Sequence, residues 1–377
     1  MNSITSTICL FFSLLIVVPM LGVFANGDEV DVWIGTGGNE GVFHLTLNTE
    51  TGKLSQPKTM NTLGSAGFLA ISPDGKILYA TAQLDKDGGV ASYRISGRGK
   101  NRSLELTGFA SSDDGKPACV SVDQDGKYLF SAQYGGGSTS SYRLDGDGSV
   151  TSLVSKIEHG AGSGVVDRRQ NTAHPHWTGT TPDNKFLCVP DLGKDAVVVY
   201  SIDADSGAIT QHSEVACPAG GGARHMKFHP SGKFAFVLNE LTLTLSVFEF
   251  DASKTNFKSI QEIATLPEDH DGLKHSAAEV RVHPNGKFVY ASNRGHDTIA
   301  VFQCDPETGK LTFLQREPIR GSRPRNFNLD PTGQWLIAAG QNSNTLALFA
   351  VDPETGKLTF TRNVVNVPNP ICVEFGR

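Results

Sequence analysis

The sequence lacks the cysteine spacing of a metal site or of a disulfide framework. One of its six cysteines, Cys9, lies in an apolar N-terminal stretch, and the other five are scattered along the chain: Cys119, Cys188, Cys217, Cys304 and Cys372. No CxxC pair and no His/Cys zinc spacing occurs, and an odd number of cysteines cannot all pair within one chain. We therefore expect buried free thiols rather than bridges or bound zinc.

Positive charge is also scarce. The 377 residues include 33 Lys and Arg against 39 Asp and Glu, which gives a formal net charge of −6. There is no basic run and no amphipathic basic helix, so the sequence argues against a nucleic-acid partner and against a membrane-surface role. Long stretches with helical periodicity are missing as well, whereas 41 Gly and 18 Pro are spread along the whole chain. This distribution predicts many turns between short elements.

The N-terminus differs from the rest of the chain. Residues 8–18, ICLFFSLLIVV, are almost wholly apolar, and Val23-Phe24-Ala25 offers small residues suited to cleavage after Ala25. We interpret residues 1–25 as a secretory signal and residues 26–377 as one exported domain, periplasmic or extracellular, without stable membrane association after cleavage. No Lys or Arg precedes the apolar core, so a membrane anchor is the alternative, although the stretch is short for a span. Without a signal the protein would be cytoplasmic.

One turn recurs through the chain. It reads SPDGK at 72–76, DQDGK at 123–127, TPDNK at 181–185, HPSGK at 229–233, HPNGK at 283–287 and DPTGQ at 330–334. The second residue of each turn serves as an anchor, and successive anchors lie 51, 58, 48, 54 and 47 residues apart. Short segments rich in Val, Phe, Ile and Tyr flank each turn, which is typical of β-strands. A period near 50 with four such segments predicts the blades of a β-propeller.

Counting the repeats gives seven blades. Six contain an anchor turn, and a seventh set at the start of the domain (DVWIGTG, GVFHLTL and TETGKLSQPKTM) lacks its innermost strand. The chain ends with PICVEFG at 370–376, which has the pattern of that missing strand. We therefore predict an all-β, seven-bladed propeller with four antiparallel strands per blade, closed when the C-terminal strand joins the N-terminal blade. Closure would leave neither sheet edge exposed.

Charged residues recur at one end of the inner hairpins. Strand 1 begins and strand 2 ends opposite the anchor turn, so both ends should meet on one face of the disc around the central channel. Six residues before the anchors stand Gly67, Ala118, His176, Arg224, Ala278 and Arg325. At the ends of the second strands stand Gln133, Asp191, Asn239, Glu240, Asn293, Arg294 and Gln341. Small residues fill equivalent positions in other blades, so the fold itself does not need these polar ones.

This rim predicts an anion site with a general acid or base, because Arg suits bidentate recognition of carboxylate or phosphate. Charges that are merely solvated or paired with one another are the alternative. Two insertions, residues 157–173 and 266–275, should lie on the same face and cover a ligand. His174 and His176 form an HxH pair, but no carboxylate cluster accompanies them, so we expect no metal and no cofactor. His229 and His283, which precede turn prolines, are expected to be structural.

Several stretches resemble the lactonase family of seven-bladed propellers, over almost all of residues 30–377. They are GSAGFLAISPDGK, AQYGGGS, VPDLGKD, RHMKFHPSGKFAFVLNEL, AAEVRVHPNGKFVYASNRGHDTIAVF and PRNFNLDPTGQWLIAAGQ. The family includes propeller-type 6-phosphogluconolactonases and fungal carboxymuconate lactonizing enzymes. The resemblance implies a His, two Arg and a Glu as catalytic residues, here His176, Arg224, Arg294 and Glu240, the residues that the anchor alignment also selects.

The function expected from this resemblance is hydrolysis of a sugar lactone, such as 6-phosphogluconolactone or a related aldonolactone. Glu240 or His176 would take a proton from water, while Arg224 and Arg294 would stabilise the oxyanion. Arg325 would hold the far end of the substrate. We expect further substrate contacts from the rim residues Asp191, Asn239, Asn293, Gln133 and Gln341. A non-catalytic propeller that binds a ligand or partner, and a carboxymuconate cycloisomerase, are the alternatives. The sequence does not predict an oligomeric state.

Overall fold

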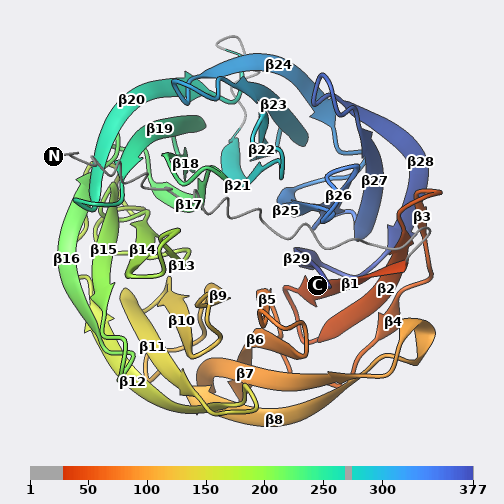
Figure 1. The fold of residues 1–377 in the computed structure, drawn as a ribbon, viewed down its shortest axis with the longest axis horizontal. Helices are drawn as coiled ribbons and strands as arrows, with labels where there is room; N and C mark the ends of the chain where they lie inside the picture. Colours follow the sequence, from red (N-terminus) through yellow and green to blue (C-terminus); the bar gives the residue numbers. More distant parts are fainter. Residues whose placement is uncertain (1–28, 268–273, 377) are drawn as a thin grey trace, which may run out of the picture.

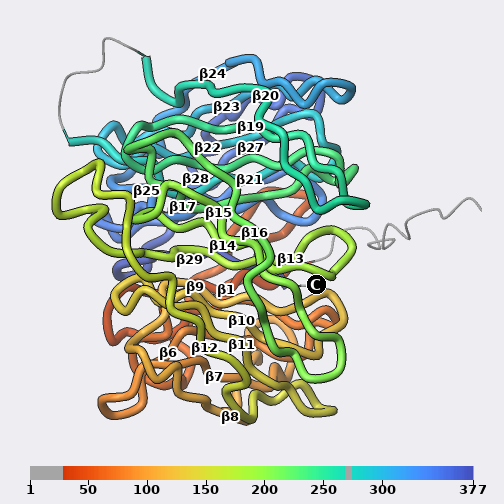
Figure 2. Tube along the Cα trace, turned by 90° about the vertical axis from the view of Figure 1, so that its left-hand side faces the viewer, coloured from red at the N-terminus to blue at the C-terminus, as the bar shows by residue number. Residues whose placement is uncertain are grey.

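A computed structural model describes residues 29–267 and 274–376 of the chain. These residues form seven antiparallel sheets arranged as blades around a central channel (Figure 1). Seen from the side, successive blades follow one another around the ring from orange through green to blue (Figure 2). The predicted seven-bladed, all-β propeller is confirmed, with one three-residue 3₁₀ helix as the only helical element of the described residues.

The blades follow the repeat in the sequence. The first contains β29 (Pro370–Phe375), β1 (Glu29–Thr36), β2 (Val42–Asn48) and the short outer strands β3 (Lys53–Leu54) and β4 (Lys58–Thr59). The second contains β5 (Leu69–Ile71), β6 (Ile77–Leu84), β7 (Asp87–Ser96) and β8 (Ser103–Ser111), with the 3₁₀ helix η1 (Gly99–Asn101) before β8. The third contains β9 (Cys119–Val122), β10 (Tyr128–Gln133), β11 (Ser138–Leu144) and β12 (Val150–Glu158).

The remaining four blades have the same order from the channel outward. The fourth contains β13 (Gly179–Thr180), β14 (Phe186–Asp191), β15 (Ala196–Ile202) and β16 (Ile209–Ala216). The fifth contains β17 (Ala223–Phe228), β18 (Phe234–Asn239), β19 (Thr244–Asp251) and β20 (Asn256–Ala264). The sixth contains β21 (Ser276–Val282), β22 (Phe288–Arg294), β23 (Thr298–Cys304) and β24 (Leu311–Pro318). The seventh contains β25 (Pro324–Leu329), β26 (Trp335–Gly340), β27 (Thr345–Val351) and β28 (Leu358–Asn366).

The ring closes as predicted from the sequence. Strand β29 pairs antiparallel with β1, with Val32 opposite Phe375 and Gly35 opposite Cys372. The apolar side chains of both strands enter a buried cluster shared with the seventh blade. The C-terminal strand therefore supplies the inner edge of the first blade and removes the edge that it would otherwise expose.

The anchor turns of neighbouring blades are joined by histidines. His229 Nε2 donates to the carbonyl of Gly286 at 2.9 Å, and His283 Nε2 donates to that of Gly333 at 3.0 Å. Both glycines have a φ of +74°, a conformation that disfavours side chains. A Cβ at Gly286 would stand 2.5 Å from His229 Nε2. The two histidines therefore have the structural role expected of them.

β-Bulges at the start of three inner strands decide which side chains face the channel. Register shifts occur between Ala223 and His225 in β17, and at the equivalent places in β21 and β25. In a regular strand adjacent side chains point to opposite faces, whereas a bulge re-aims one of them. Arg224 and His225 consequently both line the channel, although they are neighbours in sequence.

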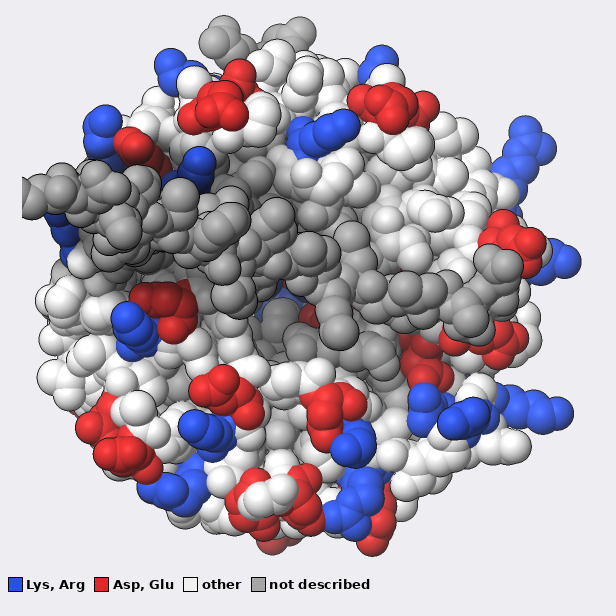
Figure 3. Space-filling view, viewed as in Figure 1, with Lys and Arg blue, Asp and Glu red and all other residues white. Residues whose placement is uncertain are grey.

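Other predictions about the chain have mixed outcomes. All five cysteines outside the N-terminal stretch are free, and Cys217 alone among them is half-buried rather than buried. On the face seen in Figure 3, basic and acidic side chains are interspersed around the disc, in keeping with the absence of basic runs from the sequence. Within the described ranges, no helix combines the length and hydropathy that a membrane span needs. The predicted signal, residues 1–25, lies outside the described residues.

Candidate functional site

The carboxylate of Glu240 lies at the centre of an arginine cluster. Its Oε2 accepts hydrogen bonds from Arg224 Nε at 2.9 Å and is 3.0 Å from Arg294 Nη2. Its Oε1 accepts a bond from Arg169 Nη2 at 2.6 Å. The structure thus brings together three of the residues that the repeat alignment selected and adds a fourth, Arg169.

Backbone contacts hold two of these arginines in place. Arg224, on the β17 bulge, is 1% exposed and donates through Nη1 to the carbonyl of Ala278 in the next blade. Arg294, the last residue of β22, donates through Nη2 to the carbonyl of Ala277 at 2.9 Å. Carbonyls near the start of β21 therefore anchor guanidinium groups from two different strands. Such fixed positions favour directional recognition of an anion.

Arg169 comes from the insertion between β12 and β13, and the repeat gave no sign of it. Asp195 holds the inserted loop in place, because its carboxylate accepts hydrogen bonds from Ser163 Oγ at 2.9 Å and from Gln170 Nε2. The same carboxylate accepts the backbone amide of Gly222 at 2.7 Å, just before β17. The spacing of 58 residues between anchors reveals the insertion, but no pattern in it identifies Arg169. Of the second insertion, residues 268–273 lie outside the described residues.

A small cavity opens beside this cluster. It has a volume of about 140 Å³, and we call it the rim cavity. The polar side chains that line it are Thr81, Lys116, His176, Arg224, His225 and Arg325. His176 and Arg325 thus meet Arg224 here, as the sequence predicted. Glu240 and Arg294 do not line the cavity, and they act on it through Arg224.

Positive charge at the rim cavity is not balanced. Among the described residues, neither Arg325 nor Lys116 forms an ion pair, and Glu240 is already shared by three arginines. Burial, with repulsion from Arg294 and Arg325, lowers the pKa of Arg224 to about 9. Burial and repulsion from Arg294 lower that of Arg325 to about 10. An anion entering this cavity would relieve that repulsion.

Glu240 and His176 differ sharply as potential bases. Burial opposes ionisation of Glu240, but Arg294, Arg224 and Arg169 outweigh it and lower its pKa to about 2. Burial, reinforced by Arg224, His225 and Arg325, lowers the pKa of His176 well below its ordinary value. At neutral pH Glu240 is therefore a stable anion with occupied oxygens. His176 is a neutral imidazole whose Nδ1 has no hydrogen-bond partner among the described residues.

The structure does not place Asp191 with the arginines. Its Oδ2 lies 2.7 Å from His159 Nδ1, and its Oδ1 accepts the backbone amide of His174 at 2.7 Å. The carboxylate is fully buried and holds the 157–173 insertion against β14. The ring of His174 stacks on Tyr134 at 4.5 Å, and the ring of His176 meets the same tyrosine edge-on at 5.4 Å.

The four predicted amides lie in the blades around the channel and are engaged there. Asn239 donates to Ser246 Oγ at 2.8 Å, and Asn293 accepts from Thr265 Oγ1 at 2.6 Å. Gln133 accepts from Ser138 Oγ at 3.2 Å, and Gln341 donates to Asn369 Oδ1 at 2.9 Å. Asn239 Oδ1 and Gln341 Oε1 are buried without partners among the described residues, yet neither residue lines the rim cavity. Their contact with substrate stays a prediction.

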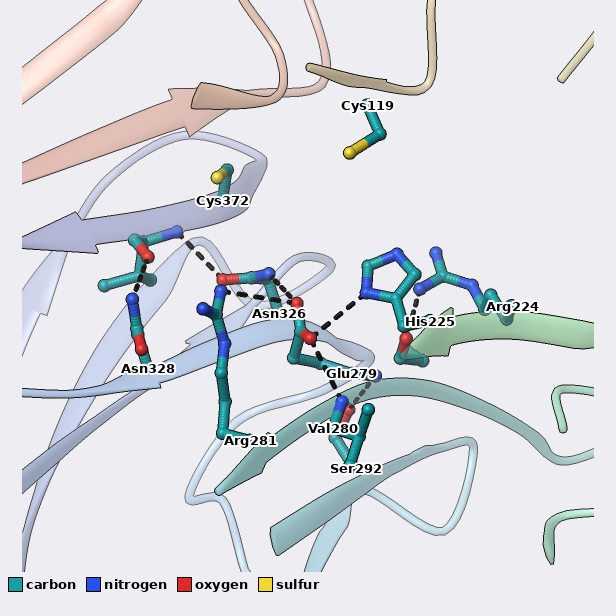
Figure 4. Close-up of polar contacts among 12 residues, drawn as sticks. Cys119, Arg224, His225, Glu279, Val280, Arg281, Ser292, Asn326, Asn328 and Cys372 are labelled. Atoms are coloured by element: carbon teal, nitrogen blue, oxygen red, sulfur yellow. Dashed lines mark hydrogen bonds and ion pairs between the residues drawn. The ribbon is translucent and has the colours of Figure 1, made fainter. Parts of the chain in front are cut away.

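A second polar cluster lies deeper in the channel, and sequence reasoning missed it. Figure 4 shows Glu279 between His225 and Arg281, with Asn326 beside it. Glu279 is fully buried, and its Oε1 lies 3.1 Å from His225 Nδ1. Arg281 lies 3.5 Å from both Glu279 and Glu374. Beyond this cluster is a larger cavity of about 670 Å³ lined by Trp177, Lys227 and anchor-turn residues, which we call the turn-side cavity.

Within the described residues there is no group of three or more His, Cys, Asp and Glu side chains arranged to hold a metal ion. The side chains that the structure places at the rim are guanidinium groups, imidazoles and a buried carboxylate.

Comparisons with known proteins agree with this architecture. The family described as lactonase, seven-bladed β-propeller, matches residues 31–375. A 6-phosphogluconolactonase of Bacillus subtilis is 36% identical over 348 residues, which cover 91% of this chain and 97% of that protein. The structure of a periplasmic gluconolactonase of Pseudomonas aeruginosa superposes with a TM-score of 0.85 at 28% identity, covering 93% of this chain and 99% of the other. A protein from Lactobacillus plantarum reaches 0.86 at 31% identity, covering 93% and 100%.

Proposed function

Because the chain belongs to the lactonase family of seven-bladed β-propellers, we propose that it hydrolyses a sugar lactone at the rim cavity, with 6-phosphogluconolactone or a related aldonolactone as substrate. The observation that carries the proposal is the unbalanced positive charge of Arg224, Arg325 and Lys116 around a buried space. A phosphorylated or carboxylated lactone supplies the missing negative charge, and the oxyanion formed on attack adds to it.

The reaction follows from the placement of these groups. Water attacks the lactone carbonyl, and Arg224 stabilises the oxyanion as its charge develops. Together with Arg224, Arg325 and Lys116 bind the acidic group of the substrate. Glu240 and Arg294 position Arg224 rather than touching the substrate. Since the carboxylate of Glu240 contacts three arginines and its pKa is about 2, an imidazole of the rim cavity is the better proton acceptor.

Export forms part of the proposal. The apolar stretch at 8–18 and the small residues before Asn26 support a cleaved signal. The likeness to a periplasmic gluconolactonase agrees with an exported enzyme. An exported protein would encounter unphosphorylated lactones, and among these a carboxylated lactone would supply the acidic group in place of a phosphate. Mass spectrometry of the protein from each cell fraction tests this, because the exported form should begin at Asn26.

The deciding experiment measures turnover of phosphorylated and plain δ-gluconolactone side by side with the purified protein. Because lactones open spontaneously in water, the rate with enzyme is compared with the rate in buffer at the same pH. We expect saturable acceleration with at least one of the two. Binding without acceleration of either lactone would favour a non-catalytic propeller instead.

A further inference from the structure

The rim cavity contains a histidine that the sequence alignment did not select. His225 follows Arg224 in β17, and the bulge turns both side chains towards the channel. It is 1% exposed, and its ring centroid lies 5.2 Å from that of His176. Two imidazoles from neighbouring blades therefore meet at one small buried space.

A fixed carboxylate determines the orientation of His225. Glu279 Oε1 lies 3.1 Å from His225 Nδ1 and also accepts the backbone amide of Val280 at 3.0 Å. Its Oε2 accepts a bond from Asn326 Nδ2 and lies 3.5 Å from Arg281 Nη2. Burial opposes ionisation of Glu279, but Arg281, His225 and Lys227 lower its pKa well below the usual range. The group is thus an anion that can only accept hydrogen bonds.

This arrangement assigns the tautomer of His225. Because Glu279 can only accept, Nδ1 of the neutral ring carries the proton, and Nε2 keeps its lone pair. Figure 4 shows Nδ1 directed at Glu279 and the other ring nitrogen pointing away from it. The side chain of His225 lines the rim cavity, whereas Glu279 does not.

Nε2 of His225 is buried and has no hydrogen-bond partner among the described residues, and the same holds for His176 Nδ1. A buried unsatisfied polar atom costs about 1–3 kcal/mol, so folded proteins rarely keep one without a reason. Both nitrogens belong to side chains that line the same cavity of about 140 Å³, so a hydrogen-bond donor bound there is the partner that the two rings lack. Water is the donor that lactone hydrolysis requires.

We propose that His225 is the general base of this lactone hydrolysis and that Glu279 is its positioning residue. The inference rests on the proposed function. His176 faces the same cavity, but the described residues place no carboxylate against its ring, so nothing there would stabilise its protonated form. Glu279 supplies that stabilisation for His225, in the way that a buried carboxylate supports the imidazole of a hydrolytic triad.

The proton balance is complete without another reactant. The oxygen of water forms a bond to the carbonyl carbon, and the water proton passes to His225 Nε2. When the tetrahedral intermediate collapses, the bond from that carbon to the ring oxygen breaks, and the imidazolium returns the proton to the leaving alkoxide. The product acid then ionises in solvent, and His225 is neutral again.

The charges around His225 suit this role once substrate is bound. Burial lowers its pKa to about 3; Glu279 raises it, while Arg224 and Lys227 lower it, and His176 is the nearest titratable ring. The empty site therefore keeps His225 neutral and able to accept a proton. An anionic substrate held by Arg224 and Arg325 opposes their field and strengthens the base when attack begins.

The test compares full-length wild type with His225→Gln, Glu279→Gln and the control His283→Gln, using the lactone that wild type turns over. His283 is a buried structural histidine at an anchor turn, outside the rim cavity. General-base catalysis contributes about 10²–10⁴-fold, so His225→Gln should lower kcat by at least about 100-fold with little change in KM. His283→Gln should keep the wild-type kcat, with at most a lower Tm.

Glu279→Gln needs a readout that a purely structural role would not move. Loss of the carboxylate should lower kcat and move the acidic limb of the kcat–pH profile to lower pH, because the negative charge that raises the pKa of His225 is gone. A profile that keeps its acidic limb would contradict the positioning role.

Failure of this inference differs from failure of the proposed function. If wild type accelerates no lactone, the proposed function is wrong. If wild type is active and a folded His225→Gln keeps kcat within about twofold, the dyad is wrong. Should His225→Gln not fold, ¹⁵N NMR of wild type decides: a proton on Nδ1 supports the dyad, and a proton on Nε2 overturns it.

Discussion

The two ends of the propeller channel differ in how their charges are balanced. At the turn-side end, Arg281 lies 3.5 Å from both Glu279 and Glu374. There Lys227 lies over the ring of Trp177, 4.5 Å from its centroid. These two cations face two carboxylates. At the rim end, one carboxylate, Glu240, is shared by three arginines, and further cations stand beside it without partners among the described residues.

Cavity size alone would point to the wrong end. The turn-side cavity measures about 670 Å³ and the rim cavity about 140 Å³. The larger space is lined mostly by strand and turn residues whose charges are already compensated, whereas two histidines that each have an unsatisfied ring nitrogen line the smaller one. Uncompensated charge and unsatisfied polar atoms are costly to the fold, so they mark a functional site better than volume does.

The largest effect is expected from deleting residues 368–377, which should damage both ends at once. The deletion removes β29 and with it Glu374, and it exposes an edge of the first blade. We expect the truncated protein to aggregate or to lose its single cooperative thermal transition. Calorimetry or circular dichroism during heating measures this. A truncated protein that melts like the parent would contradict the closure seen here.

Arg281→Met should separate stability from substrate recognition. Removing one partner of a buried ion pair costs about 3–5 kcal/mol, and here it leaves Glu279 and Glu374 without their arginine. Urea unfolding should show a loss of that order. Because Arg281 does not line the rim cavity, the preference for a charged over a neutral lactone should not change, even if both rates fall through Glu279. An altered preference would assign the turn-side end to the substrate.

Arg224→Ala should have the opposite pattern, with the larger effect on charged substrate. A charge-assisted hydrogen bond contributes about 1.5–3 kcal/mol, so kcat/KM for an anionic lactone should fall at least about tenfold. The kcat/KM for the neutral lactone should fall less, because this substrate has no acidic group and only its oxyanion interacts with the guanidinium. Wild-type rates with both substrates in a folded variant would exclude the rim cavity as the active site.

The rim histidines should also make the fold sensitive to acid. The pKa of His225 is lowered to about 3 and that of His176 well below its ordinary value of 6.5, both first of all by burial. Below pH 6.5 the unfolded chain therefore binds protons that the folded chain does not. Stability should be complete above that pH and fall below it, by up to about 1.4 kcal/mol per pH unit for each histidine.

Urea unfolding between pH 7 and 5 measures this slope, and His225→Gln should make it shallower. The lowered pKa of Glu240, about 2 instead of 4.5, also stabilises the fold, but this stabilisation is lost only below pH 4.5. Glu240 therefore does not affect the slope between pH 7 and 5. Of the groups facing His225, Glu279 has a pKa lowered below this range and Arg224 one of about 9, above it, so neither changes protonation there. Lys227 and His176 face it as well, and burial is the first cause that lowers the pKa of each. An unchanged slope would show that His225 titrates normally in the folded state.

The fold could be predicted from the sequence because the same turn and the strands around it recur along the chain. Six anchor turns near a 50-residue period and one orphan strand are enough to count blades and close the ring. The same alignment brought His176, Arg224 and Arg325 to one end of the channel, where they line one cavity. The alignment did not select His225, because strict alternation along a strand would turn the residue after Arg224 away from the channel. The amino-acid sequence does not reveal the bulge that turns it back.

Other site residues were missed for different reasons. Glu279 stands five residues before its anchor, where the neighbouring blades have His225 and Asn326, so the repeat aligns these polar residues, but only the position six before the anchor was assigned to the rim. A position at the end of a strand also does not reveal whether the side chain already has hydrogen-bond partners. Asp191 and Asn239 occupy predicted rim positions, yet the carboxylate of Asp191 and the amide nitrogen of Asn239 bond within the loop and blade that carry them.

The smallest effect is expected from Arg169→Ala, which tests how far the insertion contributes to the rim. Arg169 contacts Glu240 at 2.6 Å, but its side chain is 39% exposed, so solvent screens the pair. Exposed ion pairs contribute about 0.2–1 kcal/mol, which limits the expected change in kcat/KM to about fivefold. Arg224 and Arg294 still hold the carboxylate, so kcat should barely change and KM should carry the effect. The exposed neighbour Arg168, whose only ion pair among described residues is with Asp167, gives the matched control in Arg168→Ala. A loss at Arg169 as large as at Arg224 would mean that the loop supplies a substrate contact and that the rim cavity extends beneath it.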